Sequence, residues 1–320
     1  MTIKLDKKDW RIIYELCENS RISRTQLARK LSMNKNTVEY RIQRLLKIGI
    51  IKSFFMSVNL YSLGYYNYNL LIKVKKDSRE FIDFLVNSPH TLVVEPFVGE
   101  WHLLVEIAVK KNEEMYELIE KMKEKFSDII DNYELHPTLY SIKLEQLPFE
   151  IPDIGKPQKI EFENKKRDYD EKDMDILKEL TCDSTMSFVD LGNKLDMTYE
   201  TVSLRVKRMI KEGIIQKFSS QIMFYLLGYE FYFVMVTLRH LSSERESAFR
   251  RYISSSNNIR YAFVSASEQK VFMYYLSKNA EDLNVFLQNM NNEFYDIIFS
   301  QTFLVSTGLY KYKLLPVSDK

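Results

Sequence analysis

An internal repeat constrains the fold of this chain more than any other feature. A shift of 164 residues lays residues 6–65 over residues 170–229 without a gap, and 25 of these 60 aligned positions carry the same amino acid. Unrelated stretches agree at roughly one position in twenty, so the match indicates a duplicated unit. Both copies are therefore expected to fold through the same order of elements.

The segment between the copies has the composition of a linker. It contains three prolines and many charged residues, and it shows no sustained hydrophobic periodicity. Within each copy, a helical first part is followed by alternating strands and helices. We therefore predict two helical domains at 1–64 and 169–228, two α+β domains at 65–147 and 229–320, and a linker at 148–168.

The helical part of each copy is predicted to be a winged helix-turn-helix. In the first copy, apolar residues at helical spacing indicate helices over 9–18, 24–31 and 35–48. Gly49 ends the third helix, as a glycine just past a helix does, and residues 50–58 then alternate enough for a two-stranded wing. The second copy repeats this order, with Gly213 as the stop.

The remainder of each copy has the pattern β-α-β-β-α-β. The first copy has predicted strands at 67–76, 91–96, 102–110 and 139–147, with helices at 78–88 and 112–130. The second copy has predicted strands at 231–238, 259–266, 270–277 and 303–315, with helices at 243–253 and 281–298. This order is typical of a ferredoxin-like antiparallel sheet with helices on one face. The predicted fold class is therefore α+β.

Composition places the chain among soluble globular proteins. Apolar residues make up 45% and charged residues 28% of the sequence. Cys17 and Cys182 are too few for a disulfide framework and lack the spacing of metal ligands, which favours the reducing cytoplasm. No apolar run approaches the ~18 residues that a membrane span needs. We expect a cytoplasmic protein with no membrane association, no metal and no cofactor.

The middle and third helices have the features of a DNA-reading unit. Leu27, Ala28 and Leu31 are predicted to face the core, and Met33 is predicted to plug the turn that follows. Asn34 is a good N-cap for the third helix, and Thr198 takes that place in the second copy. The helix core positions are Val38, Ile42 and Leu45, matched by Val202, Val206 and Met209.

The opposite face of the third helix is the predicted contact surface for double-stranded DNA. Residues near its N-terminus would reach base edges: Lys35, Asn36, Glu39, Tyr40 and Gln43 in one copy, and Tyr199, Glu200, Ser203, Leu204 and Lys207 in the other. The residues better placed for phosphates are Arg41, Arg44, Lys47, Arg205, Arg208 and Lys211. Residues 35–47 and 199–211 each carry four basic and one acidic residue, whereas the chain's net charge is only +2. This local excess favours a nucleic-acid partner.

Two other interpretations of these helices remain open. Charged residues on a helix face also serve simply to keep it in solvent, and winged helices also serve as docking modules for other proteins. The recurrence of the turn, the cap, the arginines and the Gly-Ile-Ile sequence in both copies weighs against the first interpretation.

These residues resemble the Lrp/AsnC family of feast/famine regulators. The likeness lies in LDKKDWRIIYEL and YDEKDMDILKEL, in the Thr-Val-x-x-Arg pattern of both third helices, and in Leu63-Gly64 and Leu227-Gly228. The resemblance implies a transcription regulator whose ferredoxin-like domains pair and bind small effectors such as amino acids. Because two units share this chain, it also implies a single-chain pseudo-dimer. Further association into homo-oligomers and an asymmetric DNA site are compatible with this arrangement.

The resemblance also suggests where an effector would bind. The family's turn between the middle two strands carries a glycine and then an aspartate near the ligand. This chain has Gly99, Trp101 and His102 there, with His102 in place of the aspartate. The second copy has Ser267 and Lys270 in that turn and lacks both family residues. A tight turn with Trp101 as a packing anchor is the alternative interpretation.

An enzyme is the other alternative for this architecture. Siroheme decarboxylases share it and also occur as paired units, and their chemistry would need basic residues and a well-placed histidine or tyrosine. The four histidines here are His90, His102, His136 and His240, and none recurs at the equivalent position of the other copy. The wing entry also lacks the arginines that such an enzyme would be expected to carry. We therefore expect a regulator without enzymatic activity.

Overall fold

The computed structural model describes residues 3–145, 147, 165–239, 242–267 and 269–316. The predicted linker 148–168 lies outside these residues except for 165–168. The chain forms two compact units. The first holds the described residues of 1–59, 144–161 and 167–230, and the second holds those of 60–143, 162–166 and 231–320. The units group equivalent parts of both copies and do not follow the chain, so the predicted domain boundaries remain predictions.

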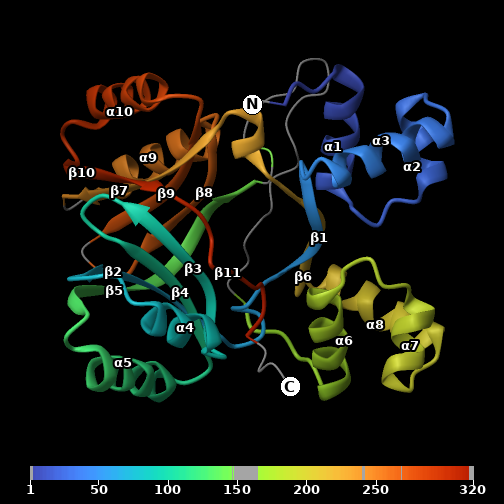
Figure 1. The fold of residues 1–320 in the computed structure, drawn as a ribbon, viewed down its shortest axis with the longest axis horizontal. Helices are drawn as coiled ribbons and strands as arrows, with labels where there is room; N and C mark the ends of the chain where they lie inside the picture. Colours follow the sequence, from blue (N-terminus) through green and yellow to red (C-terminus); the bar gives the residue numbers. More distant parts are fainter. Residues whose placement is uncertain (1–2, 146, 148–164, 240–241, 268, 317–320) are drawn as a thin grey trace. The chain divides into compact units, whose positions relative to one another are not determined.

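The first unit contains both helix-turn-helix segments (Figure 1). The first copy supplies α1 (Lys7–Glu18), α2 (Arg24–Leu31), α3 (Lys35–Lys47) and strand β1 (Ile51–Val58). The second copy supplies α6 (Glu171–Cys182), α7 (Phe188–Leu195), α8 (Tyr199–Lys211), strand β6 (Ile215–Ile222) and the short 3₁₀ helix η1 (Phe224–Leu227). The three predicted helices of each copy are thus confirmed.

Side-chain caps fix where these helices begin. Asp6 and Asp170 cap α1 and α6, and each forms a reciprocal capping box with the aspartate three residues later. The predicted caps of the third helices are confirmed. The Asn34 side chain accepts a hydrogen bond from the Asn36 N–H, and the Thr198 side chain accepts one from the Thr201 N–H. These caps satisfy backbone donors that the helix itself leaves free.

The predicted two-stranded wing within each copy is wrong. Residues Ile51–Val58 form one strand, and it pairs antiparallel with Ile215–Ile222 of the other copy. Phe54 lies opposite Ser220 and Met56 lies opposite Phe218. The reason lies in the sequence, because residues 51–58 include no glycine, proline, asparagine or aspartate that would reverse the chain. The wing position is instead a two-stranded ribbon to which each copy contributes one strand.

The second unit is built from the two predicted β-α-β-β-α-β repeats. The first repeat consists of β2 (Tyr66–Val74), α4 (Arg79–Asn87), β3 (Thr91–Val98), β4 (Leu103–Val109), α5 (Asn112–Phe126) and β5 (Ile130–Leu144). The second consists of β7 (Glu230–Leu238), α9 (Ser243–Ser255), β8 (Ile259–Ser265), β9 (Lys270–Ser277), α10 (Ala280–Phe294) and β10 (Ile298–Ser306), followed by β11 (Lys311–Tyr312). The predicted fold class is confirmed.

The boundaries near the second helix of each repeat differ from the prediction. The helix expected over 112–130 ends at Phe126, and the last strand begins at Ile130 instead of residue 139. The strand expected over 303–315 is two strands, Ile298–Ser306 and Lys311–Tyr312. In both repeats an apolar pair follows the helix (Ile129 and Ile130, then Ile297 and Ile298), and these residues extend the helical pattern although they start the strand.

The strands of both repeats join in one sheet that closes on itself. The order is β10-β7-β9-β8-β5-β2-β4-β3-β11, and β10 also pairs with β3. Each repeat's helices cover its outer face: α4 and α5 pack on one apolar cluster, and α9 and α10 pack on another (Figure 1). A third cluster from both repeats, which includes Leu71, Phe97, Phe233 and Phe272, lies on the opposite, inner face.

Candidate nucleic-acid interface

The third helix of each copy buries one face and exposes the other. Val38, Ile42 and Leu45 of α3 are fully buried, and Val202, Val206 and Met209 of α8 are buried at the equivalent positions. These residues are spaced at i, i+4 and i+7, so one stripe of each helix faces the core. The predicted core faces are confirmed, and the opposite faces are left open to a partner.

The outward face of α3 is polar. Lys35, Asn36, Tyr40, Gln43 and Lys47 are exposed, and Tyr40 keeps 69% of its surface accessible. Glu39 is less available than the sequence suggested. Its carboxylate is half-buried and accepts hydrogen bonds from Arg24 Nε (2.9 Å) and Gln43 Nε2 (2.9 Å). Glu39 therefore holds Arg24 and Gln43 in place.

The outward face of α8 is more apolar. Tyr199 and Leu204 are 51% and 72% exposed, and Glu200, Lys207 and Lys211 are exposed around them. Ser203, which we expected on this face, is buried. The two helices therefore display different chemistry from equivalent positions.

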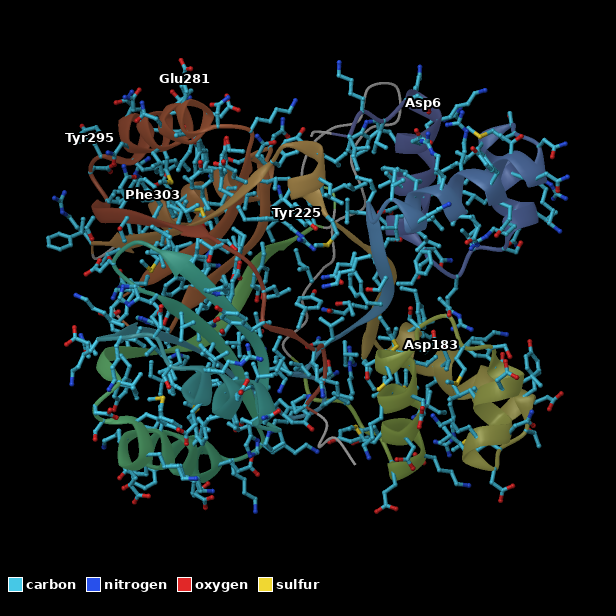
Figure 2. The ribbon with its side chains drawn as sticks, in the orientation of Figure 1. Asp6, Asp183, Tyr225, Glu281, Tyr295 and Phe303 are labelled. Atoms are coloured by element: carbon cyan, nitrogen blue, oxygen red, sulfur yellow. The ribbon has the colours of Figure 1, made fainter. Side chains whose placement is uncertain are left out.

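The arginines of both third helices are held by carboxylates of the first helices. Arg41 Nη1 donates to Asp6 (2.8 Å) and to Asp9 Oδ1 (2.8 Å), and Arg44 Nη2 donates to Asp9 Oδ2 (2.5 Å). Asp9 is buried, and Figure 2 shows Asp6 beside the start of α1. This ion-pair cluster fixes the angle between α1 and α3.

The second copy repeats the same cluster. Arg205 Nη1 donates to Asp170 (2.8 Å) and to Asp173 Oδ1 (2.9 Å), and Arg208 also bonds to Asp173. The backbone N–H of Asp173 and the Arg205 guanidinium hydrogen-bond the Asp170 carboxylate and lower its pKa. We expected these arginines at phosphates, but their charge is directed first at buried aspartates. The Asp-x-x-Asp and Arg-x-x-Arg spacings, which occur in both copies, are the sequence signal from which these ion pairs could have been predicted.

Another arginine, Arg21, joins the two copies, and sequence reasoning missed it. The guanidinium of Arg21 donates to the carbonyl oxygens of Ser184 (2.7 Å) and Met186 (3.0 Å) in the other copy. It also lies over the rings of Phe188 and Phe218, 4.4 and 5.2 Å from their centroids. The repeat gave no hint of this contact, because the equivalent residue in the second copy is a threonine.

Further contacts fasten the ribbon to the first helix. Lys217 Nζ pairs with Glu18 at 2.6 Å, and the Ser219 hydroxyl donates to the Cys17 carbonyl oxygen at 2.8 Å. The Ser20 N–H also donates to the carbonyl oxygen of Phe218. Together with the strand pairing of β1 and β6, these bonds place both helix-turn-helix segments in one compact unit.

The three residues predicted to bind an effector have packing roles in the second unit. Trp101 is buried in the inner apolar cluster. His102 Nδ1 accepts a hydrogen bond from the Val74 N–H at 3.0 Å. Gly99 has a φ of +146°, and a Cβ there would lie 2.6 Å from Leu304 Cδ2. The residues do come together at one turn, and their role in effector binding is still a prediction.

The described residues show no group of three or more His, Cys, Asp and Glu side chains arranged to hold a metal ion. Within the same part of the chain, neither Cys17 nor Cys182 forms a disulfide. None of the helices within the described ranges is both long enough and apolar enough to cross a membrane.

Comparison with known proteins identifies the helical segments. A family model described as winged helix-turn-helix DNA-binding matches residues 5–52 and 169–216. An uncharacterized HTH-type transcriptional regulator of Pyrococcus horikoshii is 35% identical over 127 residues, which cover 38% of this chain and 84% of that protein. A similar regulator of Pyrococcus furiosus is 32% identical over 129 residues, which cover 40% of this chain and 83% of that protein.

A solved structure resembles the chain over nearly its whole length. The crystal structure of the siroheme decarboxylase NirDL superposes with a TM-score of 0.63 at 13% identity, covering 95% of this chain and 92% of that one. A second NirDL structure, in complex with an iron-uroporphyrin III analogue, superposes with a TM-score of 0.62 at 14% identity. At this level of identity the likeness shows a shared fold.

Proposed function

Because this chain belongs to the Lrp/AsnC family of HTH-type transcriptional regulators, we propose that it controls transcription by binding a specific double-stranded DNA site as a single-chain pseudo-dimer. One observation carries the proposal. Two helix-turn-helix segments lie in one compact unit, joined by an antiparallel ribbon, and each keeps the outward face of its third helix open. A pair of linked readers suits a DNA site with two half-sites.

In this mechanism, α3 and α8 enter the major groove and the exposed side chains near their N-termini reach the bases. Lys35 and Gln43 offer hydrogen bonds to base edges, and Lys47 and Lys211 contact phosphates. The arginine–aspartate clusters act indirectly, because they set the angle at which each third helix projects. Arg44 and Arg208, both partly exposed, retain donors for a phosphate.

The two readers are proposed to prefer different bases. The α3 face offers amide and ammonium groups, whereas the α8 face offers Leu204 and Tyr199. Polar side chains discriminate bases through hydrogen bonds, whereas an apolar side chain contacts the methyl group of thymine. We therefore propose an asymmetric operator with a thymine-containing half-site under α8.

Selection of bound sequences from random DNA tests this proposal. The expected consensus has two unlike half-sites, and Gln43→Ala should relax one of them while Leu204→Ala relaxes the other. A perfect palindrome would contradict the asymmetry, and failure to enrich any sequence would contradict specific binding. Lys121→Ala, on the exposed face of α5, is the control and should leave the consensus unchanged.

We further propose that a small-molecule effector changes the affinity of the protein for DNA. The turn with Gly99, Trp101 and His102 is the predicted location, and a small molecule such as an amino acid is the predicted class. Substituting Trp101 would disturb packing, so His102→Asp, which restores the family residue, is the more informative variant. An amino acid that changes operator affinity, and does so at lower concentration in this variant than in the wild type, would support the assignment.

A second candidate function is tetrapyrrole decarboxylation, favoured by the fold likeness to a siroheme decarboxylase over 95% of the chain. The histidines give it little support. His136 is buried and hydrogen-bonded to Ser267 Oγ and Glu134, His102 accepts from a backbone N–H, and His240 lies outside the described residues. Mixing the protein with siroheme separates the functions. A stable visible absorbance together with CO₂ release would replace the regulator proposal, and unchanged siroheme would support it.

A further inference from the structure

The inner face of the closed sheet has a polar region beside its apolar cluster. Glu106 on β4 and Glu95 on β3 both carry carboxyl groups there, and burial together with the nearby Glu95 carboxyl raises the pKa of Glu106. Tyr274 on β9 reaches them from the other repeat, because its hydroxyl donates to Glu95 Oε2 at 2.8 Å. Carboxyl groups are rarely buried without partners, so this region calls for a functional explanation.

Strand register places the neighbours of Glu106 in one row across the sheet. Glu106 lies opposite Asn69 on β2 and opposite Val93 on β3, and Val93 lies opposite Tyr312 on β11. Asn67, two residues before Asn69, points to the same face of β2. Three strands therefore direct polar side chains toward one region.

The carboxyl groups of Glu95 and Glu106 differ in their hydrogen-bond partners. Glu95 accepts hydrogen bonds from the hydroxyls of Tyr274 and Ser306. Within the described residues, the Glu106 carboxyl has no hydrogen-bond or ion-pair partner, and its strongest charged neighbour is another acid. The side-chain oxygen of Asn67 is also buried without a donor. Both unmatched groups are acceptors, so a group that would complete this region must donate hydrogen bonds.

Solvent reaches this region beside the tyrosines. Tyr312 is 37% exposed, and Glu106 and Tyr261 are partly exposed. A small molecule can therefore approach these side chains from solvent. A ligand there would lie between unmatched acceptors and aromatic rings.

We propose that this region is a binding site for a small organic cation carrying a primary ammonium group. Such a group has three donors and no acceptor, which matches the Glu106 carboxylate and the Asn67 oxygen. Tyrosine rings also attract ammonium ions through their faces. The carboxyl groups of Glu95 and Glu106 would repel a carboxylate, which argues for an amine over a free amino acid. The site does not depend on the proposed DNA binding.

Protonation of Glu106 would couple to this binding. Burial and the Glu95 carboxyl raise the pKa of Glu106 to about 7. The other titratable groups around it are Tyr261 on β8, Tyr274 on β9 and Tyr312 on β11, with the Arg260 guanidinium near both Glu95 and Tyr312. An ammonium ion needs the ionised carboxylate, so affinity should fall about tenfold per unit as the pH drops below 7.

Calorimetric titration of the full chain tests the site, with n-butylamine, putrescine and ethanolamine as amine probes and n-butanol and glycine as controls. At pH 8 we expect at least one amine to bind and both controls to fail, with at least tenfold weaker binding at pH 6. Glu106→Gln should weaken the amine at least tenfold at pH 8, and Glu100→Gln, on the exposed β3–β4 turn, should leave it unchanged.

Three results would overturn the proposal. These are no binding of any amine at pH 8, equal binding of n-butanol or glycine, or unchanged affinity in Glu106→Gln. Tyr312→Phe provides a second variant if Glu106→Gln does not fold. It keeps the aromatic face, so amine affinity should change less than threefold, and complete loss of binding would contradict the cation–aromatic contact.

Discussion

At the scale of single residues, the arginine–aspartate clusters change what the third helices are expected to do. Arg41 and Arg205 look like phosphate contacts in the sequence, yet each bonds two aspartates of a helix N-terminus. Charge reversal at Arg44 and Arg208 would confront the buried Asp9 and Asp173, so it would damage the fold along with DNA binding. Exposed residues such as Gln43 and Lys47 are the better probes of the interface.

Removing one of these arginines should destabilise the protein. Arg41→Ala leaves the buried Asp9 with one fewer donor, and we expect a loss of about 2 kcal/mol in the free energy of unfolding. Arg205→Ala should act similarly in the second copy. Urea denaturation of the full chain measures both, with the exposed Lys47→Ala as a control expected within ~0.5 kcal/mol of wild type. Equal stabilities for Arg41→Ala and Lys47→Ala would contradict this account of the cluster.

Glu106 should make stability depend on pH. Its folded pKa of about 7 lies above the ordinary value of 4.5, so the folded state holds the proton more tightly than the unfolded chain. The contribution of Glu106 to the free energy of unfolding is therefore greatest below pH 4.5, falls as the pH rises toward 7, and levels off above it, by roughly 3 kcal/mol in all. Thermal unfolding from pH 5 to 8 checks this. Glu106→Gln should flatten the decline, and an unchanged decline would assign it to another group.

At the scale of elements, helices were easier to predict than strand pairing. The periodicity of Ile12, Ile13 and Leu16 and the caps Asn34 and Thr198 are local signals, and the structure confirms them. The partner of Ile51–Val58 is not a local property, because it lies about 164 residues away in the other copy. Likewise, no pattern within 91–98 indicates that β3 pairs with β10. Pairing between copies depends on tertiary packing, which a single sequence does not display.

Arg21 should be important for the joining of the two copies. Arg21→Ala leaves the carbonyl oxygens of Ser184 and Met186 without this donor and removes the guanidinium from between two rings. We expect faster amide hydrogen exchange across β1 and β6 and a stability loss of about 1–3 kcal/mol. The exposed Arg29→Ala serves as the matched control. If both variants exchange at the wild-type rate, Arg21 does not hold the copies together.

At the scale of the whole molecule, duplication lets one chain build what would otherwise need two. The repeat predicted a pseudo-dimer, and both compact units do combine elements of the two copies. The two readers have diverged, since Tyr40 and Leu204 occupy equivalent exposed positions. The sequence could not show which exposed residues remain free, because that depends on the ion pairs that hold their neighbours.

The stoichiometry of DNA binding should follow from this design. One chain carries both readers, so one chain should occupy one complete operator. Analytical ultracentrifugation of the protein with a single selected DNA duplex checks this ratio. Two chains on a duplex that contains one operator would show that the copies within a chain do not act as a pair.

The salt dependence of DNA affinity tests the central claim most directly. If α3 and α8 both lie in grooves with six to ten phosphate contacts, affinity for the selected duplex should fall by ~10³–10⁵ between 50 and 200 mM salt. Replacing Lys47 and Lys211 together by alanine should reduce the slope of log affinity against log salt by about 2. An affinity that hardly changes with salt would contradict DNA binding by these helices and favour docking to another protein.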